Sequence, residues 1–333
     1  MTKVLSLVAT TLLITSGGLF GGSYDPLRTG NYDSEPRELE VTVHAPDGRD
    51  LPLRVYLPES TTPAPVVLFS HGLGGSRNGN AFLGRHWAEH GYVAVFVQHP
   101  GSDTAVWENM PVAERKNSLQ DAASLENFMR RVHDVHAVLD ALTKWNSESG
   151  NSLAGRLDLQ KIGMSGHSFG AVTTEAVSGE NFPTLGTTLT DSRIRAAIAF
   201  SPSAPRRGTP EQAFGSVKIP WLLMTGTKDN SPIGSVDATA RLRVYPALRG
   251  APKYQVVLND AEHSAFTDRA LPGDREPRNP NHHRVMLALT TAFWDAYLKE
   301  DKNALAWLNG AGPRSVMEPA DDLKLVTGSK NSL

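Results

Sequence analysis

The segment "GMSGHSFGA" places Ser168 between Gly166 and Gly170. These residues fit the pattern G-x-S-x-G, in which a sharp turn between a strand and a helix presents a serine hydroxyl. An apolar run, "KIGMS" (161–165), precedes the motif, and "SFGAVTTEAVSG" follows it with helical character. A tight turn without chemistry is the alternative, but the strand-turn-helix order favours a nucleophile, which we assign to Ser168.

A serine hydroxyl is a weak nucleophile until a neighbouring base takes its proton. One later apolar run ends in "TGTKDNS" and the next in "NDAEHSAF", so Asp229 and His263 each lie just past a predicted strand. We predict that His263 is the general base and then the acid, and that Asp229 orients its imidazole. A loop-capping aspartate and a surface histidine are the alternatives for these positions. Asp237 and Asp260 are the next candidates for the acid.

A tetrahedral intermediate also needs hydrogen-bond donors that are already in place. The glycines of "FSHGLGGS" (69–76) let backbone N–H groups turn inward, and the helix after the serine points its N-terminus at the reacting centre. We therefore expect an oxyanion hole made of the Leu73 and Phe169 N–H groups. His71 is expected to hold its loop by hydrogen bonding rather than to transfer protons.

The remaining histidine pairs do not have the spacing of metal sites. His133 and His136 lie on one helical segment, and His282 and His283 open another, without carboxylates or cysteines at ligand spacing. We predict no metal site and no cofactor.

Composition excludes several other classes of function. The 333-residue chain has a formal net charge of -2 and no cysteine, which excludes disulfides, a cysteine nucleophile and a thiolate metal site. Nothing in the charge pattern suggests a nucleic-acid partner or a basic membrane-binding patch. The expected partner is a small-molecule ester substrate, and the sequence does not indicate an oligomeric state.

The first residues are typical of an export signal. Lys3 precedes the apolar stretch "VLSLVATTLLI", and "TSGGLFGGS" supplies small residues for cleavage. We predict a signal peptide over 1–22, no stable membrane anchor, and a secreted or periplasmic protein. The alternative is a buried N-terminal helix or strand.

Two kinds of strand pattern predict the architecture. The segments 39–45 and 51–57 alternate apolar and polar residues around an Asp-Gly turn, as a hairpin does. Continuous apolar runs typical of parallel strands follow at 65–70, 92–97, 161–165, 195–200, 220–226 and 253–258. Helical segments separate these runs, the longest at 124–145. We expect an α/β fold with a mostly parallel eight-stranded sheet, an N-terminal antiparallel hairpin and helices on both faces.

No internal repeat or second-domain boundary is found. We expect an N-terminal arm over 23–36, a catalytic domain over 37–310 and a C-terminal tail over 311–333.

The segments "VVLFSHGLGG", "GYVAVFVQHPGSD" and "IGMSGHSFGA" occur in an order that resembles the α/β-hydrolase superfamily. Within it, the chain resembles the platelet-activating-factor acetylhydrolase-like group and the bacterial predicted dienelactone hydrolases, over about residues 37–300. The resemblance implies an α/β-hydrolase fold and a serine esterase. Secreted polyester hydrolases are more distant relatives.

The chain departs from both groups in one respect each. Acetylhydrolases of this type carry the catalytic acid after the sixth strand, where this chain reads "AIAFSPSAP", with Ser201 and Ser203 and no carboxylate. The acid must then follow the seventh strand, which supports Asp229. Dienelactone hydrolases proper use a cysteine nucleophile, which this chain lacks.

The loops that pass near the site suggest the substrate. They supply Trp107, Met110, Phe214 and Phe266, each of which can be an apolar wall of the site or ordinary loop packing. The sequence has no segment for a large lid, so a short-chain carboxylic ester is the simplest substrate. The alternatives are a polyester hydrolase, a cofactor-free haloperoxidase or a peptidase on the same triad, and a non-catalytic binding protein.

Overall fold

This structure is a computed structural model, and it describes residues 24–28, 35–234, 236–271 and 273–327. The predicted signal peptide, 1–22, lies outside the described residues.

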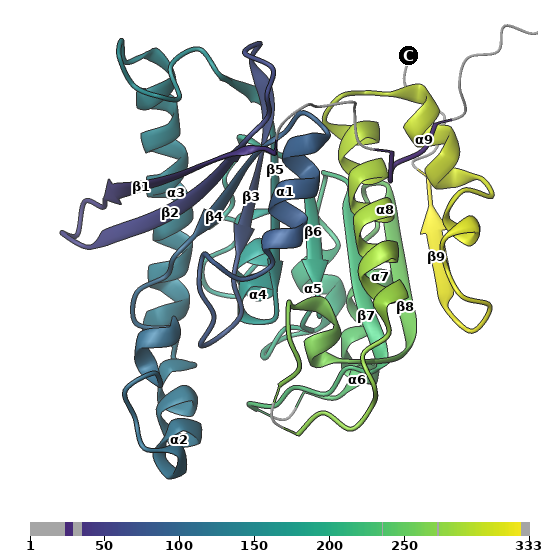
Figure 1. The fold of residues 1–333 in the computed structure, drawn as a ribbon. Coiled ribbons are helices and arrows are strands. Elements are labelled where there is room, and N and C mark those ends of the chain that lie inside the picture. Colours follow the sequence, from purple (N-terminus) through teal and green to yellow (C-terminus); the bar gives the residue numbers. More distant parts are fainter. Residues whose placement is uncertain (1–23, 29–34, 235, 272, 328–333) are drawn as a thin grey trace, which may run out of the picture.

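One mixed sheet forms the centre of the molecule, with strand order β1-β2-β4-β3-β5-β6-β7-β8-β9 (Figure 1). Its strands are β1 (Arg37–His44), β2 (Asp50–Leu57), β3 (Ala64–Ser70), β4 (Val93–Val97), β5 (Leu157–His167), β6 (Ile194–Phe200), β7 (Trp221–Lys228), β8 (Lys253–Glu262) and β9 (Asp322–Val326).

The strand patterns explain how the sheet is built. β1 and β2 form the expected antiparallel hairpin, β2 pairs antiparallel with β4, and the strands from β4 to β8 in sheet order are parallel. Every residue of β3 and β4 is buried, as expected for strands covered on both faces. The expected α/β-hydrolase architecture is confirmed.

The sheet differs from the prediction in its number of strands. β9 pairs antiparallel with β8 and lies in the segment 311–333, which we expected to be a tail. β9 is a short edge strand whose residues are all at least partly exposed. It therefore lacks the continuous apolar run by which the other strands were recognised.

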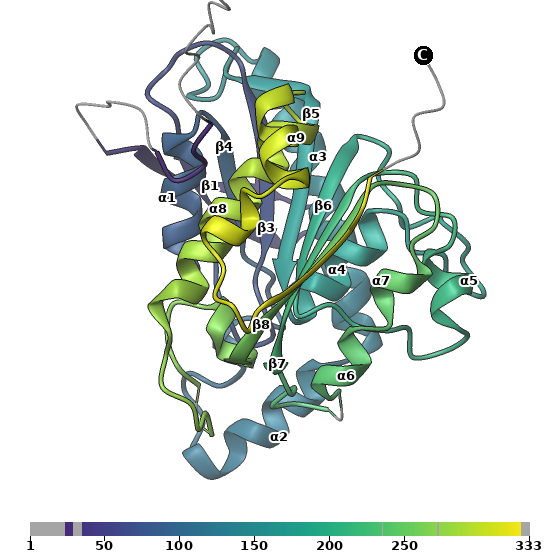
Figure 2. The ribbon, with the colours of Figure 1, turned by 90° about the vertical axis from the view of Figure 1, so that its right-hand side faces the viewer.

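Helices cover both faces of the sheet (Figure 2). Residues of α1, α8 and α9 pack in one large apolar cluster, and those of α3 and α4 pack in another on the opposite face. A third cluster lies under α5 and α7. The helices are α1 (Ala81–Glu89), α2 (Val112–Ala122), α3 (Leu125–Ser147), α4 (Phe169–Val177), α5 (Pro210–Phe214), α6 (Ala238–Arg241), α7 (Val244–Ala247), α8 (Pro280–Tyr297) and α9 (Lys302–Asn309), with 3-10 turns η1 (Thr104–Val106), η2 (His263–Phe266) and η3 (Pro313–Ser315).

The connection between β4 and α3 projects from the body of the molecule. It contains η1 and α2, and α2 lies at the lower end of Figure 1. None of the helices among the described residues is long and apolar enough to span a membrane.

Candidate active site

The serine of the G-x-S-x-G motif lies at a sharp turn between β5 and α4. Ser168 has a φ of 57°, in the region that disfavours residues with a side chain. A Cβ on Gly166 would lie 2.3 Å from the Gly170 carbonyl oxygen, and one on Gly170 would lie 1.9 Å from the Ser70 carbonyl oxygen. Both positions therefore require glycine, and the turn places Ser168 at the carboxyl end of β5.

The three residues expected to form a triad meet in one hydrogen-bonded line. The Ser168 Oγ lies 2.9 Å from the His263 Nε2, and the His263 Nδ1 lies 2.7 Å from the Asp229 Oδ1. They come from the loops after β5, β8 and β7, whose carboxyl ends meet at one edge of the sheet. With the His263 Nδ1–H donating to the carboxylate, the Nε2 is free to accept the proton of Ser168.

Asp229 is fully buried and held in its charged form. Its second oxygen, Oδ2, accepts a hydrogen bond from the Thr225 hydroxyl at 2.8 Å. Burial alone would raise the pKa of this carboxyl, but the hydrogen bond and charge of His263, together with Arg241, lower the pKa to about 2. The carboxylate is therefore negative under neutral conditions and can orient the imidazole.

Arg241, at the end of α6, contacts two residues of the expected triad, and no pattern in the sequence predicts this. Its Nε lies 3.0 Å from the Asp229 Oδ1, and its Nη2 lies 3.2 Å from the His263 Nδ1. Its Nη1 donates to the Ser201 carbonyl oxygen at 2.7 Å. This buried guanidinium thus joins the loops after β6, β7 and β8.

The other candidate acids have different partners. The Asp237 carboxylate caps α6 by accepting the Ala240 N–H at 2.8 Å. Asp260 is exposed and pairs with the Lys228 ammonium at 2.9 Å. Of the three candidate carboxylates, Asp229 is the one that bonds to His263.

The two expected oxyanion donors come from two segments that meet near the serine, since a Cβ on Gly72 would lie 3.5 Å from the Ser168 Cβ. Phe169 is the first residue of α4, and Leu73 lies in the loop after β3. Within the described part of the chain, neither N–H donates a hydrogen bond to another residue. Both donors are therefore available to a ligand, and the positive end of the α4 dipole adds to the attraction for an anion.

Two histidines near the serine serve as hydrogen-bonding groups. The His71 Nδ1 donates to the Gly72 carbonyl oxygen at 2.7 Å, and its Nε2 accepts the His99 N–H at 3.1 Å. The His167 Nε2 donates to the His263 carbonyl oxygen at 3.1 Å. Burial lowers the pKa of both His71 and His167, so both rings are neutral.

Of the four residues for which a wall position and ordinary packing were both open, two are core residues. Phe214 packs against Trp221 and Phe266 against Phe200, all fully or almost fully buried. The sequence could not distinguish a wall position from a core position here, because a single aromatic residue in a loop segment has no periodicity. Trp107 is half-buried and donates its Nε1–H to the Gly74 carbonyl oxygen at 2.8 Å, so it contacts the loop that carries Leu73.

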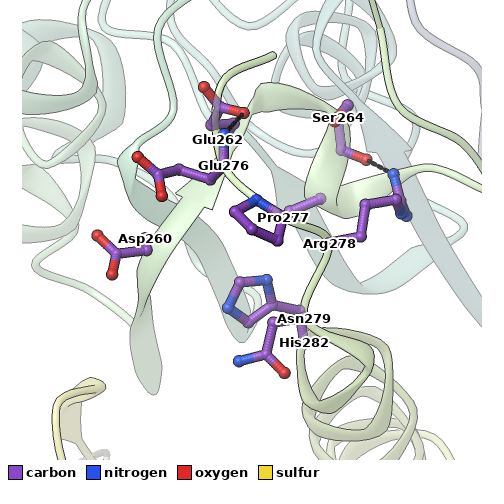
Figure 3. A pocket seen from close by; sticks show the side chains of 9 residues that line it. Asp260, Glu262, Ser264, Glu276, Pro277, Arg278, Asn279 and His282 are labelled. Carbon is purple, nitrogen blue, oxygen red and sulfur yellow. Dashed lines mark hydrogen bonds between the residues drawn. The ribbon is translucent and has the colours of Figure 1, made fainter.

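A small pocket lies beside the loop that follows His263 (Figure 3). Its lining residues are Asp260, Glu262, Ser264, Ala265, Glu276, Pro277, Arg278, Asn279 and His282. The Lys228 ammonium pairs with Asp260 and Glu276, and the Arg278 Nη1 donates to the Ser264 carbonyl oxygen at 3.0 Å. The lysine offsets part of the negative charge of the lining, and Arg278 ties this segment to the η2 turn that begins at the proposed base.

In each of the two histidine pairs noted in the sequence, one member bonds to a distant backbone carbonyl. The His136 Nε2 lies 3.1 Å from the Leu189 carbonyl oxygen, and the His282 Nε2 lies 3.0 Å from that of Asn259. Among the residues that the structure describes, no group of three or more His, Asp or Glu side chains could hold a metal ion.

Comparison with known proteins supports the resemblance seen in the sequence. Residues 57–203 match the family model of platelet-activating factor acetylhydrolase, isoform II. The chain is similar to the platelet-activating factor acetylhydrolases. One such protein, from Cavia porcellus, is 26% identical over 161 residues, which cover 41% of this chain and 35% of that relative. The chain thus aligns with about a third of the relative's length.

The matched region includes only part of the candidate site. It contains Leu73, Ser168 and Phe169 but ends before Asp229 and His263. The assignment of the acid and the base to this chain therefore rests on the hydrogen-bonded geometry.

Proposed function

We propose that this chain is a serine hydrolase of short-chain carboxylic esters, a carboxylesterase or an acetylhydrolase. The observation that carries the proposal is the hydrogen-bonded line from Asp229 through His263 to Ser168, with distances of 2.7 and 2.9 Å. The similarity to acetylhydrolases over residues 57–203 agrees with the same class of reaction.

In the first half of the reaction, the His263 Nε2 takes the hydroxyl proton as the Ser168 Oγ bonds to the ester carbonyl carbon. The carbonyl electron pair moves to its oxygen, which accepts hydrogen bonds from the Leu73 and Phe169 N–H groups. The bond to the alcohol oxygen then breaks, and His263 gives its proton to the leaving alkoxide. An acyl group remains on Ser168.

In the second half, His263 takes a proton from water while the water oxygen adds to the acyl carbon. The second tetrahedral intermediate uses the same two N–H donors. It collapses as the bond to the Ser168 Oγ breaks and the serine regains a proton from His263. The carboxylic acid leaves and the enzyme returns to its starting state.

The test is the Ser168→Ala variant with p-nitrophenyl acetate. Loss of the nucleophile should lower turnover by about four to six orders of magnitude. A fluorophosphonate should label the wild-type protein at Ser168 and leave the variant unlabelled. Retention of most of the turnover in the alanine variant would reject the proposal.

A second measurement tests the acyl chain length that the enzyme prefers. A chain-length series of p-nitrophenyl esters on the purified protein should show the highest kcat/KM at the short acyl chains. A maximum at long chains would contradict the short-chain assignment.

Secretion or export to the periplasm is part of the same proposal. It is supported by the apolar segment and the small residues within positions 1–22. N-terminal sequencing of protein recovered outside the cytoplasm should find that this segment has been removed. An intact Met1 in that fraction would contradict it.

A further inference from the structure

A second line of serine, histidine and aspartate lies behind the proposed oxyanion hole. The Ser70 Oγ lies 2.9 Å from the His99 Nε2, and the His99 Nδ1 lies 2.8 Å from the Asp134 Oδ2. We call Ser70, His99 and Asp134 the buried relay. All three residues are 0% exposed, so no substrate can reach this serine, and the relay is not a second catalytic centre.

Neighbouring charges fix the direction of the hydrogen bonds in the buried relay. Arg49, at the turn between β1 and β2, lies 2.7 Å from the Asp134 Oδ1. Burial, together with the positive charges of Arg131 and Arg49, lowers the pKa of His99 well below its ordinary value. A neutral His99 donates from its Nδ1 to Asp134 and accepts the Ser70 hydroxyl proton at its Nε2.

The buried relay is joined directly to the serine turn. Ser70 is the last residue of β3, and its carbonyl oxygen would be 1.9 Å from a Cβ on Gly170. The His99 N–H donates to the His71 Nε2 at 3.1 Å, and His71 in turn holds the Gly72 carbonyl oxygen. The backbone that leads into Leu73 therefore depends on the positions of Ser70 and His99.

Arg131 connects the same loop to the other oxyanion donor. This side chain, also 0% exposed, donates from its Nη1 to the His71 carbonyl oxygen at 2.7 Å and from its Nε to the Ser102 Oγ at 2.8 Å. Its guanidinium lies 4.4 Å from the centre of the Phe169 ring. Arg131 thus touches the loop that carries Leu73 and the residue that carries the second N–H.

We infer that the buried relay and Arg131 position the N–H groups of Leu73 and Phe169 for the oxyanion. The inference rests on the proposed function. These four are positioning residues, because none of them touches the reacting atoms. Their effect is specific to the tetrahedral intermediate, since backbone donors stabilise an oxyanion only when they are fixed at hydrogen-bond distance from it.

The test compares Ser70→Ala and Asp134→Asn with a control that removes a buried hydroxyl elsewhere. Thr290→Val is the control, because the Thr290 Oγ1 accepts the Trp87 Nε1–H at 3.0 Å in the core, away from the site. Each variant is measured for kcat and KM with p-nitrophenyl acetate, for its melting temperature, and for inhibition by a short-chain trifluoromethyl ketone. The Ser168 Oγ adds to the carbonyl carbon of this ketone, and the carbonyl oxygen becomes a stable oxyanion.

We expect kcat to fall about tenfold to a hundredfold in both relay variants, with KM changed by less than about twofold. The inhibition constant of the ketone should rise in proportion to the loss of kcat. Thr290→Val should lower the melting temperature without changing kcat or the inhibition constant. If Ser70→Ala does not fold, Asp134→Asn, which keeps the side-chain shape, carries the test.

Two results would overturn the inference, and they differ in what else they reject. Folded relay variants with wild-type kcat and ketone inhibition would reject the inference alone. A wild-type protein that neither hydrolyses the ester nor reacts with a fluorophosphonate would reject the proposed function as well.

Discussion

Arg241 brings a positive charge to the side of the proposed triad that faces away from the serine. Its guanidinium contacts both Asp229 and His263, at 3.0 and 3.2 Å. A positive charge at this distance favours the ionised form of the Asp229 carboxyl and helps to lower its pKa. Arg241 therefore helps to keep the proposed acid charged despite its burial.

Replacing Arg241 by Gln tests this electrostatic role. Without the guanidinium, the buried Asp229 carboxylate loses a positive charge that stabilises its ionised form and a hydrogen bond that holds its backbone carbonyl. We expect kcat at neutral pH to fall by roughly tenfold. Arg241→Lys, which keeps the charge, should recover part of this loss, and Arg243→Gln, at an exposed neighbouring position, should leave kcat unchanged. A wild-type kcat in Arg241→Gln would contradict the role.

The identity of the acid is tested by Asp229→Asn. An amide cannot hold the imidazole in the required tautomer, so kcat should fall by about 10⁴. Asp237→Asn is the matched control, because its carboxylate caps α6 and does not bond to His263. A larger loss in the Asp237 variant would show that the acid has been assigned wrongly.

The helix that follows the nucleophile carries a buried acidic pair at its C-terminal end. Glu175, in α4, and Glu180, just after it, are 1% and 5% exposed. Glu175 accepts the Ser203 N–H at 2.9 Å, in the loop after β6. Burial raises the pKa of Glu180 to about 8, and burial with the neighbouring Glu180 raises that of Glu175.

Glu180→Gln should stabilise the protein at alkaline pH. The folded state holds a proton on Glu180 up to about pH 8, whereas an unfolded glutamate releases it near its ordinary pKa of about 4.3. The folded state therefore loses stability as the pH rises between these two values. The variant cannot ionise, so its melting temperature should exceed that of the wild type by a few degrees at pH 8 and by much less at pH 4.5.

Glu114→Gln on the exposed face of α2 is the control for this substitution. It should leave the melting temperature unchanged at both pH values. A Glu180→Gln protein that is less stable than the wild type at pH 8 would contradict the argument.

Features formed by residues that are adjacent in the chain could be predicted from the sequence, and features formed by distant residues could not. The turn at Ser168 was predicted because glycine, serine and the flanking apolar run are adjacent in the chain. β9 was missed because an exposed edge strand has a weak pattern. Arg241 and Asp134 were missed for another reason: each acquires its partners from loops or strands far away in the sequence. Such contacts leave no spacing to detect.

One edge of the sheet is formed by β9, which lies near the C-terminal end of the chain. β9 pairs with the first half of β8, from Lys253 to Val257. Just before β9, the buried Asp321 carboxylate accepts the Asn259 N–H at 2.7 Å, near the turn that leads to His263. The segment expected to be a tail thus covers the edge of the strand that positions the proposed base.

A chain that ends at residue 320 should be less stable and more prone to aggregate. Its β8 backbone would present unpaired N–H and C=O groups at the sheet edge. Calorimetry should show a lower melting temperature, and light scattering should show association at concentrations where the full chain is monodisperse. A chain that ends at residue 327 keeps β9 and is the control. Equal melting temperatures for the two truncated chains would contradict this role of β9.

The distribution of the proposed triad along the chain also has a consequence for biosynthesis. His263 follows Ser168 by 95 residues, and it follows Asp229 by 34. A ribosome therefore completes the serine turn well before the base exists, and the edge strand that supports the base comes later still. Until His263 has been synthesised, the chain carries the serine without its proposed base, so hydrolysis by this triad cannot begin before the last third of the polypeptide has folded.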